Sequence, residues 1–215
     1  MGAKMSVLDK LATSLKRNDE MPNQELAKQI VLENDQKAIK ELIINLNNPD
    51  KNIQSDCIKV LYEIGEENPS LIAEYADEFI EVLNRNNNRL IWGAMTALDA
   101  LTFENPTTVY LGLAKIIETA NKGSVITKDH TVNILIKLCS LKQYSDKAFA
   151  LLIEQLKSCP NNQLPMYSEN ATKIINNKSK AEVFIKTLSS RLDQVEKDSK
   201  RKRIEKVIKQ LNLLF

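Results

Sequence analysis

Apolar residues recur every three or four positions along almost the whole chain, which is the spacing of an amphipathic α-helix. From Ile53, for example, Cys57, Val60, Leu61 and Ile64 fall on one helical face. Runs of Asn, Pro, Gly and Ser interrupt the pattern at regular intervals and are typical of turns. The sequence therefore predicts twelve helices in six helix–turn–helix pairs, over residues 6–17, 23–34, 35–46, 53–64, 69–83, 90–101, 106–120, 127–141, 145–156, 165–175, 179–197 and 199–214.

The tripeptide Glu-Asn-Pro marks the start of two of these helices. It ends at Pro69 and again 37 residues later at Pro106, each time before an apolar run. Asn caps free backbone N–H groups, and Pro is favoured at the first helical position. Ser6, with Asp9 three residues on, is a similar start signal upstream. We therefore interpret the tripeptide as the punctuation of a repeated unit, not as a functional motif.

The second helices of four successive pairs can be aligned on this interval. They begin at Ile53, Leu90, Thr127 and Met166, at offsets of 37, 37 and 39 residues. The residue at the fifth position of each helix is fairly small, and the residue at the ninth position is large and aliphatic. The fifth positions are Cys57, Ala94, Thr131 and Asn170, and the ninth positions are Leu61, Leu98, Leu135 and Ile174. A regular period of this size predicts stacked units that each bury an apolar face on their neighbours.

The segments NNPDKNIQSDCIKVL and LIWGAMTAL resemble HEAT-type helical repeats, in which a tight turn precedes a second helix with a V-R-x-x-A-x-x-A-L core. The resemblance covers about residues 35–177. It implies an all-α, right-handed superhelix (solenoid) of about six antiparallel helix pairs, with residues 1–34 and 178–215 as capping helices of a single domain. It also implies binding, most often of protein, and no fixed activity. The Arg of the family's core is absent, so the bond that it makes between repeats is not carried over. At the four positions where the family has this Arg, the chain has Gln54, Ile91, Lys128 and Tyr167.

Composition agrees with a helical, soluble chain. Gly and Pro number only 5 and 6 among 215 residues, fewer than a sheet protein needs for its turns. No apolar run approaches the roughly 18–20 residues of a membrane span, and the N-terminus lacks a signal-peptide apolar core. The three cysteines are far apart and form no CxxC pair, so Cys57 and Cys139 are expected to be buried thiols. We expect a reduced, cytoplasmic setting.

The sequence shows no catalytic, metal or cofactor motif. His130 is the single histidine, and Cys139 would lie roughly on the opposite helical face, so a Cys–His pair is not indicated. One histidine and scattered cysteines do not make a zinc site, and phosphate-loop glycine motifs are missing. Seven acids and no basic residue lie between Lys59 and Arg85, which we interpret as a solvated helix face without EF-hand spacing. Chemistry by a carboxylate pair stays open, but we expect no enzymatic activity, metal or cofactor.

Setting aside the apolar positions leaves an outward ladder on the second helices, which in the family usually line the concave face. Tyr62 and Trp92 stand one repeat apart in it, and Trp and Tyr dominate protein-interface hot spots. Packing between repeats is the alternative, and the favoured, interpretation of Trp92. Cations and anions are mixed along the ladder, whereas a nucleic-acid face needs Lys or Arg at many levels. The predicted partner-binding residues are Lys59, Tyr62, Trp92, Thr96, Asp99, Asn133 and Lys137.

The clearest charge feature is a basic run in an otherwise balanced chain of formal net charge +2. Residues 180–215 carry 10 Lys or Arg against 5 Asp or Glu. Behind the run, apolar residues follow helical spacing, so the helix is interpreted first as a cap that closes the last repeat. The second interpretation is an anion or nucleic-acid patch. That patch comprises Lys200, Arg201, Lys202 and Arg203.

Two functions follow from these patterns. The leading hypothesis is a non-catalytic scaffold that binds a protein partner through the ladder of second helices. The alternative is a nucleic-acid-binding protein that uses the basic helix, including an enzyme that resembles alkylpurine DNA glycosylases, which are also helical repeat proteins. No catalytic motif of those enzymes matches this sequence residue by residue.

Overall fold

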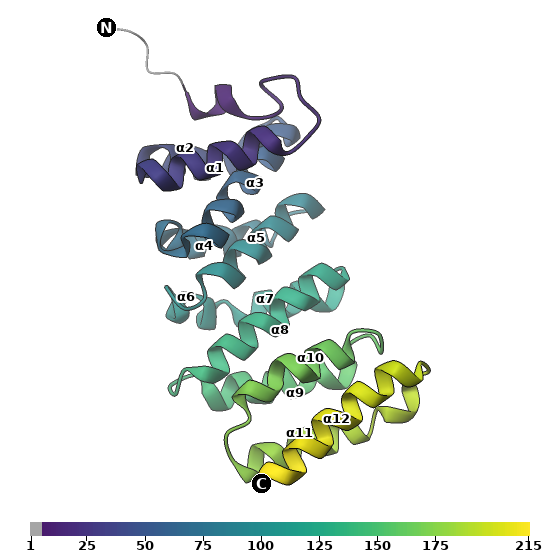
Figure 1. The fold of residues 1–215 in the computed structure, drawn as a ribbon. Helices are drawn as coiled ribbons and strands as arrows, with labels where there is room; N and C mark the ends of the chain where they lie inside the picture. Colours follow the sequence, from purple (N-terminus) through teal and green to yellow (C-terminus); the bar gives the residue numbers. More distant parts are fainter. Residues whose placement is uncertain (1–5) are drawn as a thin grey trace, which may run out of the picture. The chain divides into compact units, whose positions relative to one another are not determined.

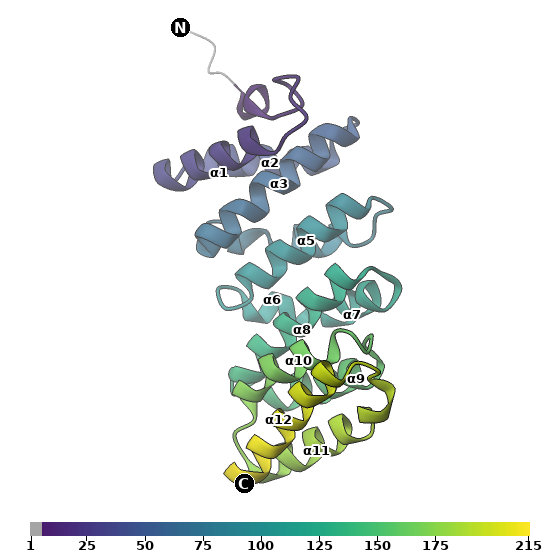
Figure 2. The same cartoon turned by 45° about the vertical axis from the view of Figure 1, so that its right-hand side comes forward.

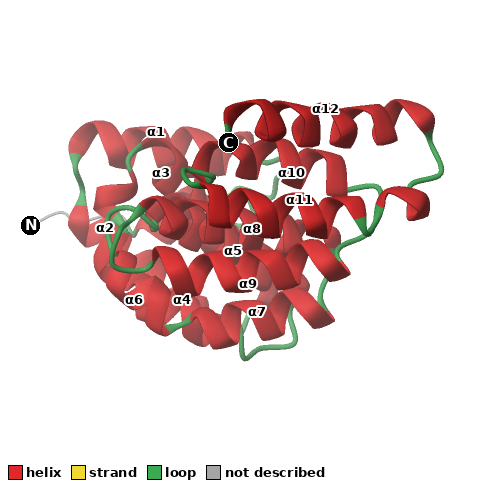
Figure 3. Cartoon of the chain, turned by 90° about the horizontal axis from the view of Figure 1, so that it is seen from below, coloured by secondary structure: helices red, strands yellow, loops and turns green. Residues whose placement is uncertain are grey.

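The computed structural model describes residues 6–215, and within that range every segment is helix, turn or loop, without a strand (Figures 1 and 3). These residues form twelve α-helices, the number that the apolar pattern predicts. The helices fall into two compact units, of which the first ends at Thr131 and the second runs Val132–Phe215. The predicted division into one domain with two capping regions stays a prediction.

The first unit holds seven whole helices and the start of an eighth. They are α1 (Met21–Glu33), α2 (Gln36–Ile44), α3 (Lys51–Glu67), α4 (Ala76–Val82), α5 (Asn88–Leu101), α6 (Pro106–Leu111), α7 (Leu113–Lys122) and the beginning of α8 (Val125–Ser140). Helix α3 packs against both α1 and α5 (Figure 2). Gly93 permits the second contact, because a Cβ there would lie 2.5 Å from Ile58 Cγ1 and 3.2 Å from the Tyr62 ring. The polar side chains of α3 and α5 are therefore held close together.

The second unit holds the rest of α8, then α9 (Ser145–Ser158), α10 (Leu164–Ala171), α11 (Lys178–Ser189) and α12 (Asp198–Leu214). Helix α12 packs against α10 and α11 and buries Ile204, Val207 and Leu211, as an amphipathic helix does. Arg191, between α11 and α12, is only 6% exposed. Its guanidinium donates to the carbonyls of Leu156 (2.8 Å) and Cys159 (2.9 Å) at the end of α9.

Four predicted helices differ in the structure. The one predicted at 179–197 ends at Ser189. Residues 6–17 form only a short 3-10 helix, Val7–Lys10, although its Ser6–Asp9 capping box is present. After it, tertiary hydrogen bonds replace helical ones: the Ala12 N–H donates to Asn23 Oδ1 (3.0 Å) and the Thr13 N–H to Asp56 Oδ2 (2.7 Å). The helix predicted at 69–83 starts as two 3-10 turns before α4. The one predicted at 106–120 is divided into α6 and α7 at Gly112, which packs closely on Ile80.

The aligned repeat positions mostly have the predicted burial. All four large ninth positions are buried, as are the fifth positions Cys57, Ala94 and Thr131. The exception is Asn170, which is exposed, while its neighbour Ala171 is fully buried. The alignment that starts at Met166 is therefore one position out of register with the buried face of α10.

Candidate partner-binding face

Lys59, a predicted partner-binding residue, is the centre of an ion-pair group on α1 and α3. Its Nζ lies 2.9 Å from the Glu20 carboxylate, 2.5 Å from that of Glu63 and 4.7 Å from the centroid of the Tyr62 ring. Burial acts to lower the pKa of Lys59, but its interactions with Glu63, Tyr62 and Glu20 outweigh that effect and raise the pKa. Lys59 is therefore a fixed internal cation, with 12% of its side chain exposed.

A second polar group joins α5 to the start of α8. His130 Nδ1 lies 2.9 Å from Asp99 Oδ2, and Nε2 lies 3.0 Å from Thr96 Oγ1. The Thr96 hydroxyl also donates to the carbonyl of Trp92 at 3.0 Å, a bond that Thr often makes inside a helix. Partners on both ring nitrogens fix the orientation of the imidazole. The structure thus places His130 beside two predicted site residues, a role that its sequence context did not indicate.

The order hydroxyl, imidazole, carboxylate in this second group invites comparison with a hydrolytic triad. Thr96 lies in the middle of α5, where the backbone N–H groups are bonded within the helix. The backbone beside Thr96 therefore does not supply the pair of free N–H donors that stabilises an oxyanion. The arrangement is better suited to holding polar side chains in place than to acyl transfer.

Glu66, at the end of α3, connects the two groups electrostatically. Burial raises its pKa, and the carboxylates of Glu63 and Asp99 raise it further, while Lys59 and His130 oppose the change. Four carboxylates, those of Glu20, Glu63, Glu66 and Asp99, thus have one ammonium group and one imidazole near them. We call these side chains, with Lys59, Tyr62, Thr96 and His130, the acidic face of α3 and α5. Of the seven acids that the sequence assigns to a solvated helix face, Glu63 is half-buried and the other six are exposed, as that interpretation predicts.

Trp92 lies one turn before Thr96 on α5 and is half-buried, outside the set of fully buried core residues. It lines a pocket of about 400 Å³ formed by the loop before α5, by α5 and α7, and by the start of α8. The structure therefore places Trp92 between the two interpretations of its role, with part of the indole packed and part open to a cavity.

The remaining predicted site residues lie in the second unit. Asn133 and Lys137 are half-buried on α8, and their part in binding stays a prediction. The basic residues of α12 make contacts within this unit. Arg203 forms a two-pronged pair with Glu169 (2.8 and 2.5 Å), Lys200 donates to Asn162 Oδ1 (2.8 Å), and Arg201 donates to the Val195 carbonyl (3.0 Å). Lys202 is exposed.

The cysteines and the acids are, by residue type, candidate reactive or metal-binding groups. All three thiols are buried, and burial raises the pKa of Cys57 and of Cys139 to about 12, which keeps them protonated. Across residues 6–215, His, Cys, Asp and Glu side chains do not gather in threes in a way that could hold a metal ion. Over the same range, no helix is both long and apolar enough to cross a membrane.

Comparison with known proteins gives likeness of structure but not of sequence. No protein-family model matches the chain, and no curated protein matches it. An engineered protein superposes with a TM-score of 0.61 at 18% identity, over 96% of this chain and 99% of its own. A designed armadillo repeat protein in complex with the peptide (KR)4 superposes with a TM-score of 0.63 at 13% identity, over 95% of this chain and 99% of its own. Computationally designed armadillo repeat proteins for modular peptide recognition superpose with a TM-score of 0.63 at 12% identity, over 94% of this chain and 97% of their own.

The chain has an armadillo- or HEAT-like helical repeat fold. The fold class expected from the 37-residue period is thereby confirmed. Within this armadillo-like fold, the acidic face belongs to α3 and α5, two of the second helices that the sequence singled out for binding.

Proposed function

We propose that the chain is a binding protein that takes an extended, positively charged peptide segment of a partner on the acidic face of α3 and α5. The observation that carries this proposal is the gathering of carboxylates on this face, where Glu20 and Glu63 pair with Lys59 and Asp99 pairs with His130. Glu66 is exposed among them, and partial desolvation together with the Glu63 and Asp99 carboxylates raises its pKa. A Lys or Arg side chain brought there would relieve this repulsion by forming a charge-assisted hydrogen bond.

The other residues of the face suit this role. Lys59 is already occupied by Glu20 and Glu63, so it does not repel an incoming cation as strongly as a free lysine would. Tyr62 is half-buried beside Lys59 and offers aromatic surface to the stem or head of a basic side chain. A designed protein of the same fold holds the basic peptide (KR)4, which supports the peptide class but not a partner.

The test is binding of a dye-labelled (KR)4 peptide, measured by fluorescence anisotropy at low salt. We expect saturable binding that weakens as salt is added, because exposed charges are screened. The variant Glu66→Gln/Asp99→Asn should lose at least about tenfold in affinity, or about 1.4 kcal/mol. A neutral (KE)4 peptide should bind more weakly than (KR)4.

The matched control is Asp77→Asn/Glu78→Gln on α4, which removes the same charge from exposed positions of the same unit. It should change the affinity by no more than about twofold, since surface charges away from a site contribute little. Equal losses in the two double variants would mean that only net charge attracts the peptide, and would contradict the proposed site. Failure of (KR)4 to bind at low salt would contradict the proposal as a whole.

A further inference from the structure

The pocket beside Trp92 has a chemical character different from that of the acidic face. Leu83, Ile91 and Trp92 form its apolar wall, and Lys115, Glu118 and Lys122 of α7 stand along its polar side. Its volume of about 400 Å³ lies within the range of small-molecule sites. The pocket belongs entirely to the first unit.

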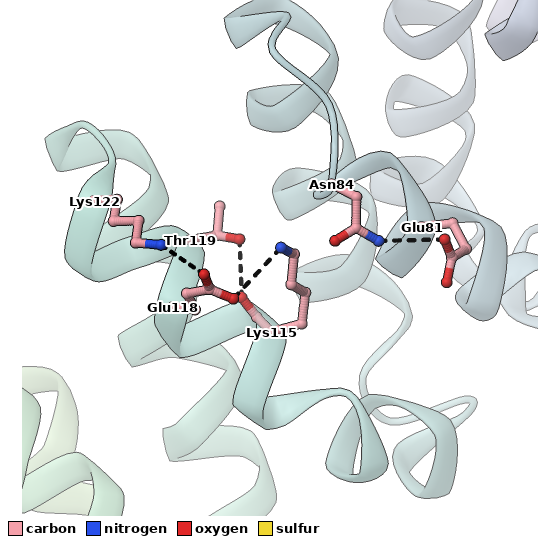
Figure 4. A network of polar contacts seen from close by, with 6 residues as sticks. All are labelled: Glu81, Asn84, Lys115, Glu118, Thr119 and Lys122. Carbon is pink, nitrogen blue, oxygen red and sulfur yellow. Dashed lines mark hydrogen bonds and ion pairs between the residues drawn. The ribbon is translucent and has the colours of Figure 1, made fainter.

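Two lysines of this pocket already hold an anion, the chain's own Glu118 (Figure 4). Glu118 Oε1 lies 2.6 Å from Lys122 Nζ, and Oε2 lies 3.5 Å from Lys115 Nζ. The hydrogen bond from Lys122 is the largest cause of a lowered pKa of Glu118, and Lys115 adds to it. Lys122 is 76% exposed and Glu118 48%, so this pairing is weak and open to competition from an incoming anion.

Positive charge exceeds negative charge along the lining. Arg85 also lines the pocket, and its guanidinium is bonded to the neutral Leu46 carbonyl (2.6 Å) and to Asn47, which leave its charge uncancelled. Three cationic residues thus line the pocket with one carboxylate. Helix α8 begins at Val125 next to the pocket and directs the positive end of its dipole there. The hydroxyl of Ser124, also in the lining, is buried and has no hydrogen-bond partner among residues 6–215.

We propose that this pocket binds a phosphate group carried on an aromatic ring, with the ring against Trp92 and the phosphate between Lys115 and Lys122 in place of Glu118. A dianionic phosphate matches the excess of two positive charges among the lining side chains, whereas a carboxylate leaves one charge unmatched. The indole offers a flat apolar surface on which a ring can stack. The amide of Asn88 adds a hydrogen-bonding group along the lining, whereas that of Asn84 donates to Glu81 (3.2 Å).

Trp92 is the only tryptophan of the chain, so its fluorescence reports on this pocket directly. The whole chain is titrated with phenyl phosphate, benzoate and inorganic phosphate. Phenyl phosphate should change the fluorescence saturably, and the other two should bind at least about tenfold more weakly. Absence of a saturable change with phenyl phosphate, or equal binding of benzoate, would overturn the proposal. A phosphotyrosine amide, titrated in parallel, should bind like phenyl phosphate if a modified side chain is the source of the group.

Two variants locate the site. Lys115→Gln/Lys122→Gln should weaken phenyl phosphate binding at least about tenfold, and Glu118→Gln should strengthen it by removing the competing carboxylate. The control Lys142→Gln/Lys147→Gln removes two exposed lysines of the second unit and should leave the affinity unchanged. Unchanged binding in the Lys115/Lys122 variant would place the ligand elsewhere and overturn the proposal. The same variant should still bind (KR)4, so failure here is distinguishable from failure of the proposed peptide function.

Discussion

At the scale of single residues, Glu66 is expected to reduce stability in favour of binding. Its pKa in the fold is raised above the usual 4.5, so the ionised side chain is disfavoured in the folded state. The wild-type chain therefore loses stability as pH rises from the usual value through the raised one. Glu66→Gln should be more stable than wild type at pH 7 by about 0.3–1 kcal/mol, with the difference vanishing below about pH 4. Urea unfolding at both pH values, followed by circular dichroism, measures this.

The control for that measurement is Glu67→Gln, which changes the exposed neighbour on the same turn. The stability difference between Glu67→Gln and wild type should change less between the two pH values. A Glu66→Gln variant that is less stable than wild type at pH 7 would contradict the prediction, because it would mean that Glu66 is already paired with a cation.

Residue spacing predicted some members of the candidate site and missed others for a physical reason. Tyr62, Thr96 and Asp99 were found because the 37-residue period places them at outward positions of successive second helices. His130 was missed because its bonds to Asp99 and Thr96 depend on the offset and rotation of α5 against α8, which apolar spacing does not specify. Glu66 was missed for a similar reason, since its perturbation comes from groups on other helices as well as its own.

At the scale of helices, the buried Arg191 and the half-buried Arg85 replace the bond between repeats that the family's Arg makes. Arg191 donates to carbonyls at the end of α9, and Arg85 donates to the Leu46 carbonyl after α2. Both arginines follow the first helix of a pair, rather than lying inside the second helix where the family's Arg is found. A sequence pattern aligned on the second helices could not reveal them.

Removal of the Arg191 guanidinium should destabilise the second unit strongly. Arg191→Met keeps much of the side-chain volume but leaves the buried carbonyls of Leu156 and Cys159 without this donor. We expect a loss of about 2–4 kcal/mol in the free energy of unfolding, measured by urea denaturation. Arg17→Met, at an exposed ion pair, is the control and should change it by less than about 0.5 kcal/mol. A loss below about 1 kcal/mol for Arg191→Met would show that water replaces the guanidinium.

Helix α12 gives a test of the nucleic-acid alternative. Replacing Lys200, Arg201, Lys202 and Arg203 by Gln removes the charge of the patch together with the Arg203–Glu169 pair. If the helix serves as a cap, the melting temperature should fall by a few degrees, corresponding to about 0.5–1 kcal/mol. Binding of labelled DNA and RNA at low salt should be weak and should differ little between variant and wild type. Tight binding by the wild type that is lost with the four charges would favour the alternative.

At the scale of the whole molecule, the fold could be predicted because it depends on a repeated apolar pattern, not on particular residues. Engineered and designed proteins share the fold at 12–18% identity, so few individual side chains are required for it. The structure departs from the predicted helices where hydrogen bonds to distant residues replace the hydrogen bonds of a helix. Ala12 and Thr13 are the clearest case, since their N–H groups bond Asn23 and Asp56 instead of extending the helix of residues 6–17.

The boundary between the two compact units makes a prediction about cooperativity. It falls between Thr131 and Val132, inside the continuous helix α8. Breaking either unit would fray a helix that the other unit also needs, and neighbouring repeats stabilise one another. We therefore expect both units to unfold together in urea. Trp92 fluorescence reports on the first unit and far-ultraviolet circular dichroism on all helices, so the two unfolding curves should coincide. A fluorescence transition completed while helical signal persists would instead show that the second unit folds independently.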